Sequence, residues 1–499
     1  MRQITGGAGM NERADIQRGD GAPAKLTGGR DVSRLGPVLV FRGFDGDRAR
    51  IGVLLVRPSA GPAPVVATDD GPVEPGVIAS SRGRTIYSVA LSLPLTPDTG
   101  FSVDGRRHPV RTDYEGDLRI LFTSCNGMED GDLDRADRNA VWDMALQDHR
   151  DHPFRLHLMG GDQIYADEVT KHHPDAEAWP DSVPDHLTNA DVPRLRADLF
   201  DLFADRYIAV YAQGPFATLA AQIPTLSMWD DHDICDGWGS LSPELLDSPV
   251  GQALFGAARD AFLVFQCAVA ADGAPPLATD PTGDNLSFHA LLPGLAILAP
   301  DLRSERRPGR VMADTGWRAY EAMLNAADRP RAFLMSSVPA IGPRLSIVER
   351  AMNMLPGEQG YEDDLRDQWQ SFKHRGEWRR FLQGMIDWQD RTGGRITALS
   401  GEIHLAAHGV MGKGDVAIRQ LVSSGIAHPP PPRAWALTLA LLSRLGDSPV
   451  PGHPIRLRSV PGHGRYVADR NYLTLERRDG AWQAQWVFER TGPTRPIAI

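Results

Sequence analysis

Residues 223–239 read IPTLSMWDDHDICDGWG, and within them an apolar run turns abruptly into a cluster of acids. The apolar half has the length and composition of a buried strand. His232 and four aspartates follow it: Asp230, Asp231, Asp233 and Asp236. Carboxylates this close together repel one another and lose water as a site forms, and metal cations usually compensate such charge.

Three other predicted strands end in the same way. ILFTSCN (120–126) ends at Cys125 and Asn126, and LHLMGGDQIYAD (156–167) continues through polar residues. ALSGEIHLAAH (398–408) is the third. Helical patterns alternate with these strands, which predicts an α/β sheet covered on both faces. Ligands of such sheets bind at the carboxyl ends of the strands, so the four clusters would converge on one edge if these strands share one sheet.

The converging residue types indicate a mixed metal site. Carboxylate oxygens favour Ca, Mg or Mn, whereas thiolate, phenolate and imidazole favour iron or zinc. Two or more ions are therefore expected, with Asp162 placed to bridge. Each fragment alone has an ordinary structural interpretation. GGD is a common turn with a helix N-cap, DDHD a common solvated loop, and Cys125 a small buried residue. The shared position at strand ends favours the metal site.

Composition limits the class of protein. The 499 residues carry a net charge of −11, which argues against general nucleic-acid binding. No signal peptide or membrane-spanning run is predicted, so no membrane partner is expected; RAWALTLALLSRLG (433–446), the most apolar helix candidate, is too short to span. Three cysteines indicate a reducing compartment, which predicts a cytoplasmic protein.

The chain is predicted to divide into three parts. Residues 1–32 are rich in glycine and charge and predict a flexible segment. Short strands over 33–115 predict a small antiparallel β domain, and 116–499 would form the catalytic domain. The Asp479–Gly480 pair predicts a hairpin, and His157, inside an alternating strand, is interpreted as a packing residue.

The motifs GGDQIYAD, MWDDHDICDGWG and SGEIHLAAHG resemble those of the calcineurin-like metallophosphatases. They are most similar to the alkaline phosphatase D (PhoD-like) branch. Cys125 stands in TSCN where the wider superfamily has an acidic ligand, and Asp231 stands where it has an asparagine. Glu402 stands where the superfamily has a histidine and the branch more often an aspartate. The resemblance covers about residues 115–475 and implies a β-sandwich core flanked by helices in four layers (αββα), with a small N-terminal antiparallel β domain.

The resemblance implies a ligand set. One ion, ferric iron, would be held by four residues: Cys125, Asp162, Tyr165 and His404. A second ion, Ca²⁺, would be held by Asp162, Asp231 and Glu402; Zn, Mn and Mg are alternative metals. His232 would stabilise the phosphoryl group or protonate the leaving oxygen, and Asn126 would donate a hydrogen bond to the phosphate.

Other residues of the same region have roles suggested by the residues themselves. Arg303 follows a strand end at Asp301, where its guanidinium would grip phosphate or form a surface salt bridge. Asp230 and Asp233 are expected to fix their loop, and Asp236 to cap the turn at Gly237.

The function expected from these residues is hydrolysis of a small-molecule phosphoester, mono- or diester, by a metal-activated water. Two alternatives remain open at this point. One is a non-catalytic metal- or phosphate-binding protein on the same scaffold. The other is an iron-dependent oxidoreductase, which cysteinate and tyrosinate disfavour because they hold iron in the ferric state.

Overall fold

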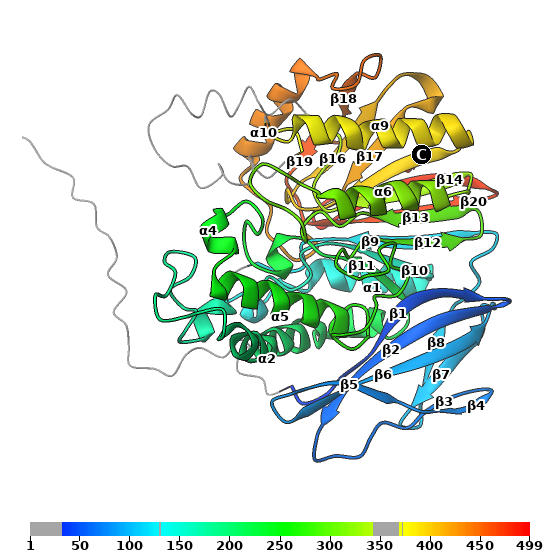
Figure 1. Cartoon of the computed structure of the whole chain (residues 1–499). Helices are drawn as coiled ribbons and strands as arrows, with labels where there is room; N and C mark the ends of the chain where they lie inside the picture. The colour runs from blue at the N-terminus through cyan, green and yellow to red at the C-terminus, as the bar shows by residue number, and fades with distance from the viewer. Residues whose placement is uncertain (1–31, 129–130, 343–368, 372) are drawn as a thin grey trace, which may run out of the picture.

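The computed structural model describes residues 32–128, 131–342, 369–371 and 373–499 (Figure 1). The segment predicted to be flexible, 1–32, lies outside the described residues except for Val32. The mixed α/β class predicted from the sequence is confirmed. No helix within the described ranges is long and apolar enough to cross a membrane.

Eleven strands form the first sheet, which has three parallel strands at its centre. These are β9 (Leu118–Thr123), β10 (Leu156–Gly160) and β11 (Thr225–Met228). Beyond β9 lie β20 (Asn471–Arg478), β21 (Ala481–Phe488), β22 (Gly492–Pro493) and β23 (Ile497–Ala498). Beyond β11 lie β1 (Leu35–Asp45), β2 (Arg48–Pro58), β6 (Arg84–Pro94) and β5 (Gly76–Ser81). The predicted hairpin at Asp479 and Gly480 joins β20 to β21.

Eight strands form the second sheet, in which β13, β14, β15 and β17 run parallel. In spatial order it contains β12 (Phe288–Leu292), β13 (Leu295–Ala299), β14 (Arg331–Ser336), β15 (Arg395–Ser400), β17 (Ile418–Val422), β16 (Ala406–Met411) and β18 (Ile455–Arg458), with β19 (Tyr466–Val467) paired to β16.

Alternation along the strands divides the apolar side chains between two faces. In β14, Phe333 and Met335 pack with residues of the first sheet, whereas Ala332 and Leu334 pack with helices. In β9, Ile120 and Phe122 belong to the cluster between the sheets. The two sheets therefore share one apolar core, as the period of two along a strand requires.

Helices cover the outer face of each sheet (Figure 1). The first sheet carries α1 (Ala140–Asp151), α2 (Val192–Tyr211), α3 (Gly214–Ala220) and α5 (Pro249–Phe265), with the short α4 (Pro243–Leu246) beside them. The second sheet carries α6 (Asp314–Ala326) and α9 (Arg375–Thr392), and α10 (Arg433–Leu442) lies at one end. Local signals set these limits: the Ser248 hydroxyl caps α5 by accepting from Gly251 N at 3.1 Å, and Gly393, at φ +68°, ends α9.

The strands predicted over 33–115 are antiparallel, but they are not all separate from the rest of the chain. β1 pairs in parallel with β11, with Val40 opposite Thr225, so β1, β2, β6 and β5 extend the first sheet. A third sheet of four strands contains β3 (Val66–Thr68), β4 (Gly71–Val73), β7 (Thr99–Val103) and β8 (Arg106–Val110). The division into domains at 115 stays a prediction, and hydrogen bonds of one sheet cross it.

His157 packs inside the molecule, as its alternating strand predicted. Its Nε2 lies 2.8 Å from the Thr123 hydroxyl, and its ring meets Trp142 edge-on. Burial lowers the pKa of His157 to about 3, so the folded protein holds it neutral.

This neutral histidine predicts part of the acid sensitivity of the fold. Below the ordinary histidine pKa of about 6.5 the unfolded chain takes up a proton that the folded chain refuses, so stability falls as pH falls. Between pH 6 and pH 4 the free energy of unfolding of the wild type should fall more steeply than that of His157→Gln, by up to about 1.4 kcal/mol per pH unit. Denaturant unfolding at a series of pH values measures the difference; parallel curves would contradict it.

Candidate metal centre

The four polar clusters meet where the carboxyl ends of two sheets face each other. Cys125 follows β9, Asp162 follows β10 and Asp231 follows β11, all in the first sheet. Glu402 and His404 follow β15, in the second sheet. The four strands therefore do not share one sheet. The chain between β11 and β15 builds a second parallel sheet instead of extending the first, and the two sets of strand ends converge across the shared core.

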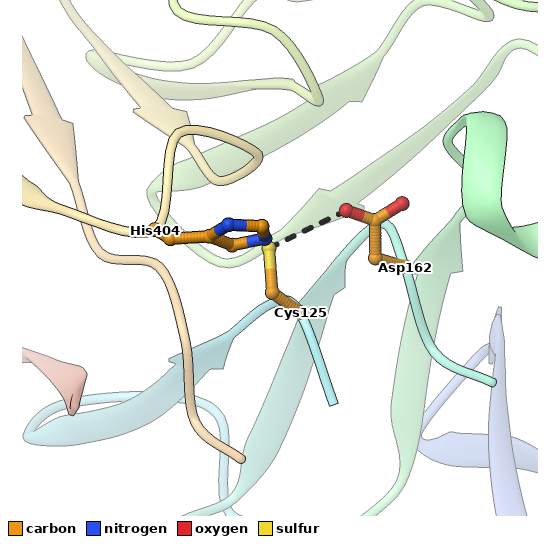
Figure 2. Close-up of side chains that lie close together, drawn as sticks. All are labelled: Cys125, Asp162 and His404. Carbon is orange, nitrogen blue, oxygen red and sulfur yellow. Dashed lines mark hydrogen bonds between the residues drawn. The ribbon is translucent and has the colours of Figure 1, made fainter. Parts of the chain in front are cut away.

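The first group of side chains contains Cys125, Asp162 and His404, which each offer an atom within 4.8 Å of the others (Figure 2). The thiol of Cys125 lies 3.4 Å from Asp162 Oδ2. Tyr165 joins this group, because its hydroxyl lies 2.9 Å from His404 Nε2. Cys125, Asp162 and Tyr165 are buried. The structure thus brings together the four residues that the resemblance assigned to one ion.

An unusual backbone conformation is shared by the predicted ligands. Ten non-glycine residues of the described chain have positive φ, and five of them are predicted ligands: Cys125 (+54°), Asp162 (+58°), Tyr165 (+49°), Glu402 (+65°) and His404 (+53°). This region costs an ordinary residue roughly 1 kcal/mol or more, and glycine is the usual occupant. Glycine has no side chain to offer a ligand, so the strain at these five positions points to a functional constraint.

A second group consists of three buried carboxylates, Asp162, Asp230 and Asp231, again within 4.8 Å of one another. Burial, followed by the charges of Asp230 and Asp231, raises the pKa of Asp162 well above its ordinary value. Within the described part of the chain, the buried Asp162 Oδ1 has no hydrogen-bond partner. Crowded carboxylates with an unsatisfied oxygen are what a cation between them would satisfy.

The pKa shifts of Cys125 and His404, in the first group, also favour a bound cation. Burial, followed by the nearby Asp162 charge, raises the pKa of the Cys125 thiol well above its ordinary value, so a cation is needed to hold the thiolate. Burial and the neighbouring His428 and His232 lower the pKa of His404, which leaves the neutral imidazole that metals bind.

Asp233 and Ser424 hold the ligand loops together. The Asp233 carboxylate accepts three backbone N–H groups, from Asp162 at 2.9 Å, Gln163 at 2.8 Å and Asp230 at 3.0 Å. The Ser424 hydroxyl accepts from His404 N at 2.9 Å and lies 3.1 Å from the Cys125 thiol. The predicted loop-fixing role of Asp233 is confirmed.

Arg303 is fully buried and pairs with the acids of the β11 loop. Its guanidinium forms an ion pair with Asp230, lies 3.4 Å from Asp231 Oδ1 and donates to Trp238 O at 3.2 Å. The expected surface salt bridge is thus a buried one.

The expectation that Asp236 caps the turn at Gly237 was wrong: Gly237 N donates to Asp231 Oδ2 at 3.0 Å, and the Asp236 side chain is exposed.

His232 lies beside the first group, stacked on Tyr165 with ring centroids 4.3 Å apart. Its Nδ1 is 3.0 Å from an Asp167 carboxylate oxygen. Burial alone would lower the pKa of His232, but the charges of Asp167 and Asp231 outweigh it and raise the pKa well above the ordinary value. The imidazolium is therefore the favoured form.

Asn126 is held by a buried network on its far side. Its Oδ1 accepts from Trp142 Nε1 at 2.7 Å, and its Nδ2 donates to Gln163 O at 3.2 Å. Arg138 donates to Asn126 O and pairs with Asp132, which also pairs with Arg206 at 3.0 Å. Both ends of the Asn126 side-chain amide are thereby held by hydrogen bonds. Its predicted contact with phosphate stays a prediction.

Glu402 is in none of the groups of possible metal ligands found in the described residues, which are the two above and a third of Asp231, His232 and Asp236. Its backbone N–H donates a hydrogen bond to the Cys125 sulfur. The role of its carboxylate as a ligand stays a prediction.

Three residues of the site had no role assigned from the sequence: Asp167, Ser424 and His428. The ring of His428 stacks on His404 with centroids 3.5 Å apart. Asp167 is the last residue of the GGDQIYAD motif, so its place beside predicted ligands could have indicated a role in the site. Ser424 and His428 follow β17, whose sequence shows nothing that distinguishes a site residue from an ordinary loop.

Comparisons with known proteins agree with this arrangement. The family described as PhoD related phosphatase matches residues 110–358, a range that includes Cys125, Asp162, Tyr165, Asp231 and Arg303. A solved structure of PhoD covers 94% of this chain and 90% of its own, with a TM-score of 0.58 and 13% identity. At that identity the likeness concerns the fold alone.

A curated relative is the uncharacterised protein YGR266W of Saccharomyces cerevisiae, 24% identical over 398 residues. The match covers 65% of this chain and 56% of the yeast protein, so the chain spans little more than half the length of this relative.

The fold is similar to that of PhoD, and candidate metal ligands lie at the facing ends of its strands. The chain belongs to the PhoD-like alkaline phosphatases.

Replacing one carboxylate oxygen of Asp233 should remove hydrogen bonds that hold the ligand loops together. Asp233→Asn turns one acceptor into an NH₂ group that faces backbone donors, which should lower the free energy of unfolding by about 2–4 kcal/mol. Asp236→Asn, on the same loop with an exposed side chain, should change it by less than about 0.5 kcal/mol. Denaturant titration of both variants tests the assignment, which equal effects would refute.

Proposed function

We propose that this protein is a metal-dependent phosphoester hydrolase acting on small-molecule mono- or diesters in the cytoplasm. The observation that carries the proposal is the meeting of Cys125, Asp162, Tyr165 and His404, each on left-handed backbone, at the carboxyl ends of two facing sheets. Strained, buried side chains of this kind persist where function requires them.

The proposed ligand sets follow the two groups of side chains. Cys125, Asp162, Tyr165 and His404 would hold ferric iron, since thiolate and phenolate favour that state. Asp162, Asp231 and Glu402 would hold Ca²⁺, with Zn, Mn or Mg as substitutes. When bound, such ions clamp the phosphate, lower the pKa of water and offset charge on the attacking and leaving oxygens.

His232 is the residue that we assign to proton transfer. The raised pKa keeps its imidazole protonated, so it has a proton to give to the leaving oxygen. Asp167 accepts from Nδ1 and thereby fixes the ring and its charge. The stacking on Tyr165 holds the ring beside the proposed iron ligands.

Asn126 and Arg303 have supporting roles in the proposal. The Asn126 amide has a second N–H besides the one that donates to Gln163 O, and this N–H is assigned to a phosphate oxygen. Arg303 acts through Asp230 and Asp231, whose carboxylates it holds, and not by gripping the substrate.

Hydrolysis of p-nitrophenyl phosphate and bis(p-nitrophenyl) phosphate tests the proposal. Wild-type activity should disappear with a chelator and return when metal is added. Asp162→Asn should lose activity at least about a hundredfold, because it removes the ligand shared by both sites. Asp70→Asn, on a turn remote from the site with a mostly exposed side chain, should keep full activity. Activity that survives both the chelator and Asp162→Asn would contradict the proposal.

His232→Gln tests the proton-transfer role separately. With p-nitrophenol, a good leaving group, the loss of rate should be modest. With phenyl phosphate, whose phenolate leaving group needs protonation, the loss of rate should be larger, by about tenfold or more. An equal loss on both esters would mean that His232 stabilises the phosphoryl group and does not act as an acid.

A further inference from the structure

The most apolar segment of the sequence, RAWALTLALLSRLG, forms a helix that is only half covered. The inner face of α10 buries Ala436 and Leu439 against Leu405. Its outer face leaves Leu437 66% exposed and Leu441 60% exposed. A helix with leucines on both faces is expected to lie between two apolar surfaces, and the described residues supply one of them.

The position of α10 ties it to the metal centre. Its buried residues pack in one cluster with Leu405 and with the partly buried Ile403. Ile403 lies between Glu402 and His404, so α10 rests on the ligand loop of the second sheet. Figure 1 shows the helix at the periphery of the molecule, beside β19.

The sequence segment that contains α10 has a net charge opposite in sign to that of the whole chain. Residues 416–468 contain six arginines and one acid, Asp447, in a chain with a net charge of −11. Arg375 neutralises Asp447 through two hydrogen bonds of 2.9 Å. Exposed arginines stand at the two ends of the α10 segment, Arg433 and Arg444, and Arg456 and Arg458 of the following strand β18 are exposed as well.

We propose that α10 is an interfacial helix that docks the protein on an anionic lipid surface. Leucines on one helix face bury in the boundary between headgroups and acyl chains, and flanking arginines are attracted to anionic headgroups. A second copy of this chain fits the face less well, because a two-fold contact would bring the arginines of both copies together. This inference departs from the expectation of no membrane partner, and it does not depend on the proposed catalysis.

Vesicle co-sedimentation of the full chain tests the proposal. The protein should bind vesicles of phosphatidylcholine mixed with phosphatidylserine, bind phosphatidylcholine alone far more weakly, and lose binding at high salt. The double variant Leu437→Asp/Leu441→Asp should bind the anionic vesicles about tenfold or more weakly.

The matched control is Val65→Asp/Val77→Asp, which places the same charges at two equally exposed apolar residues of the N-terminal strand region. This control should bind vesicles like the wild type. Both double variants should unfold at the wild-type temperature and should hydrolyse a water-soluble phosphoester at the wild-type rate. If no variant hydrolyses any phosphoester, the proposed function fails while the vesicle result still decides the docking.

Three outcomes would overturn the docking. One is absence of binding to every vesicle, and another is equal binding by the wild type and the Leu437→Asp/Leu441→Asp variant. The third is a wild-type dimer, seen by light scattering, that this variant dissolves, since the face would then be an interface between copies.

Discussion

Asp162, Asp230 and Asp231 place three carboxylates within 4.8 Å of one another in a buried site, and their mutual repulsion is the constraint on which the centre depends. At an effective dielectric constant near 20, each pair of charges about 4 Å apart costs roughly 4 kcal/mol. The neighbouring side chains offset part of this cost. Arg303 forms an ion pair with Asp230, and backbone N–H groups donate hydrogen bonds to the neighbouring Asp233 carboxylate. Among the described residues Asp162 Oδ1 has no hydrogen-bond partner, and a cation is the kind of group that would satisfy it.

The two-sheet architecture explains how such a site can be built at all. A single parallel sheet offers ligands along a line, whereas two facing sheets bring strand ends together from opposite sides. Cys125 and Asp162 come from one side and His404 from the other. The backbone at these residues is left-handed, and their ligand atoms lie within 4.8 Å of one another. Local strain is thus balanced by the apolar core that holds the sheets together.

The sequence predicted the strand ends well, because an apolar run followed by acids is a local signal. It predicted the α/β class and the hairpin at Asp479 and Gly480 for the same reason. It did not predict that β15 lies in a different sheet from β9, since the pairing of distant strands leaves no mark within either strand. The embedding of β1 beside β11 was missed for that reason too.

The ligand set itself came from a resemblance to a family, and the geometry of Cys125, Asp162, Tyr165 and His404 agrees with it. Contacts made by ordinary residue types could not be foreseen in the same way. Nothing in VSSG distinguishes Ser424 from any loop serine, although its hydroxyl joins His404 to Cys125. Arg303 was expected at the phosphate because a guanidinium suits it, and the structure places that group among buried acids instead.

Elemental analysis of the purified protein decides whether this site holds metal. The protein would be prepared without chelator or affinity tag, alongside Asp162→Asn and the remote control Asp70→Asn. Stoichiometric iron with a second divalent ion in the wild type and the control, and loss of both ions in Asp162→Asn, is the result predicted. A wild-type protein that binds no metal even after reconstitution would contradict the account and favour a non-catalytic scaffold.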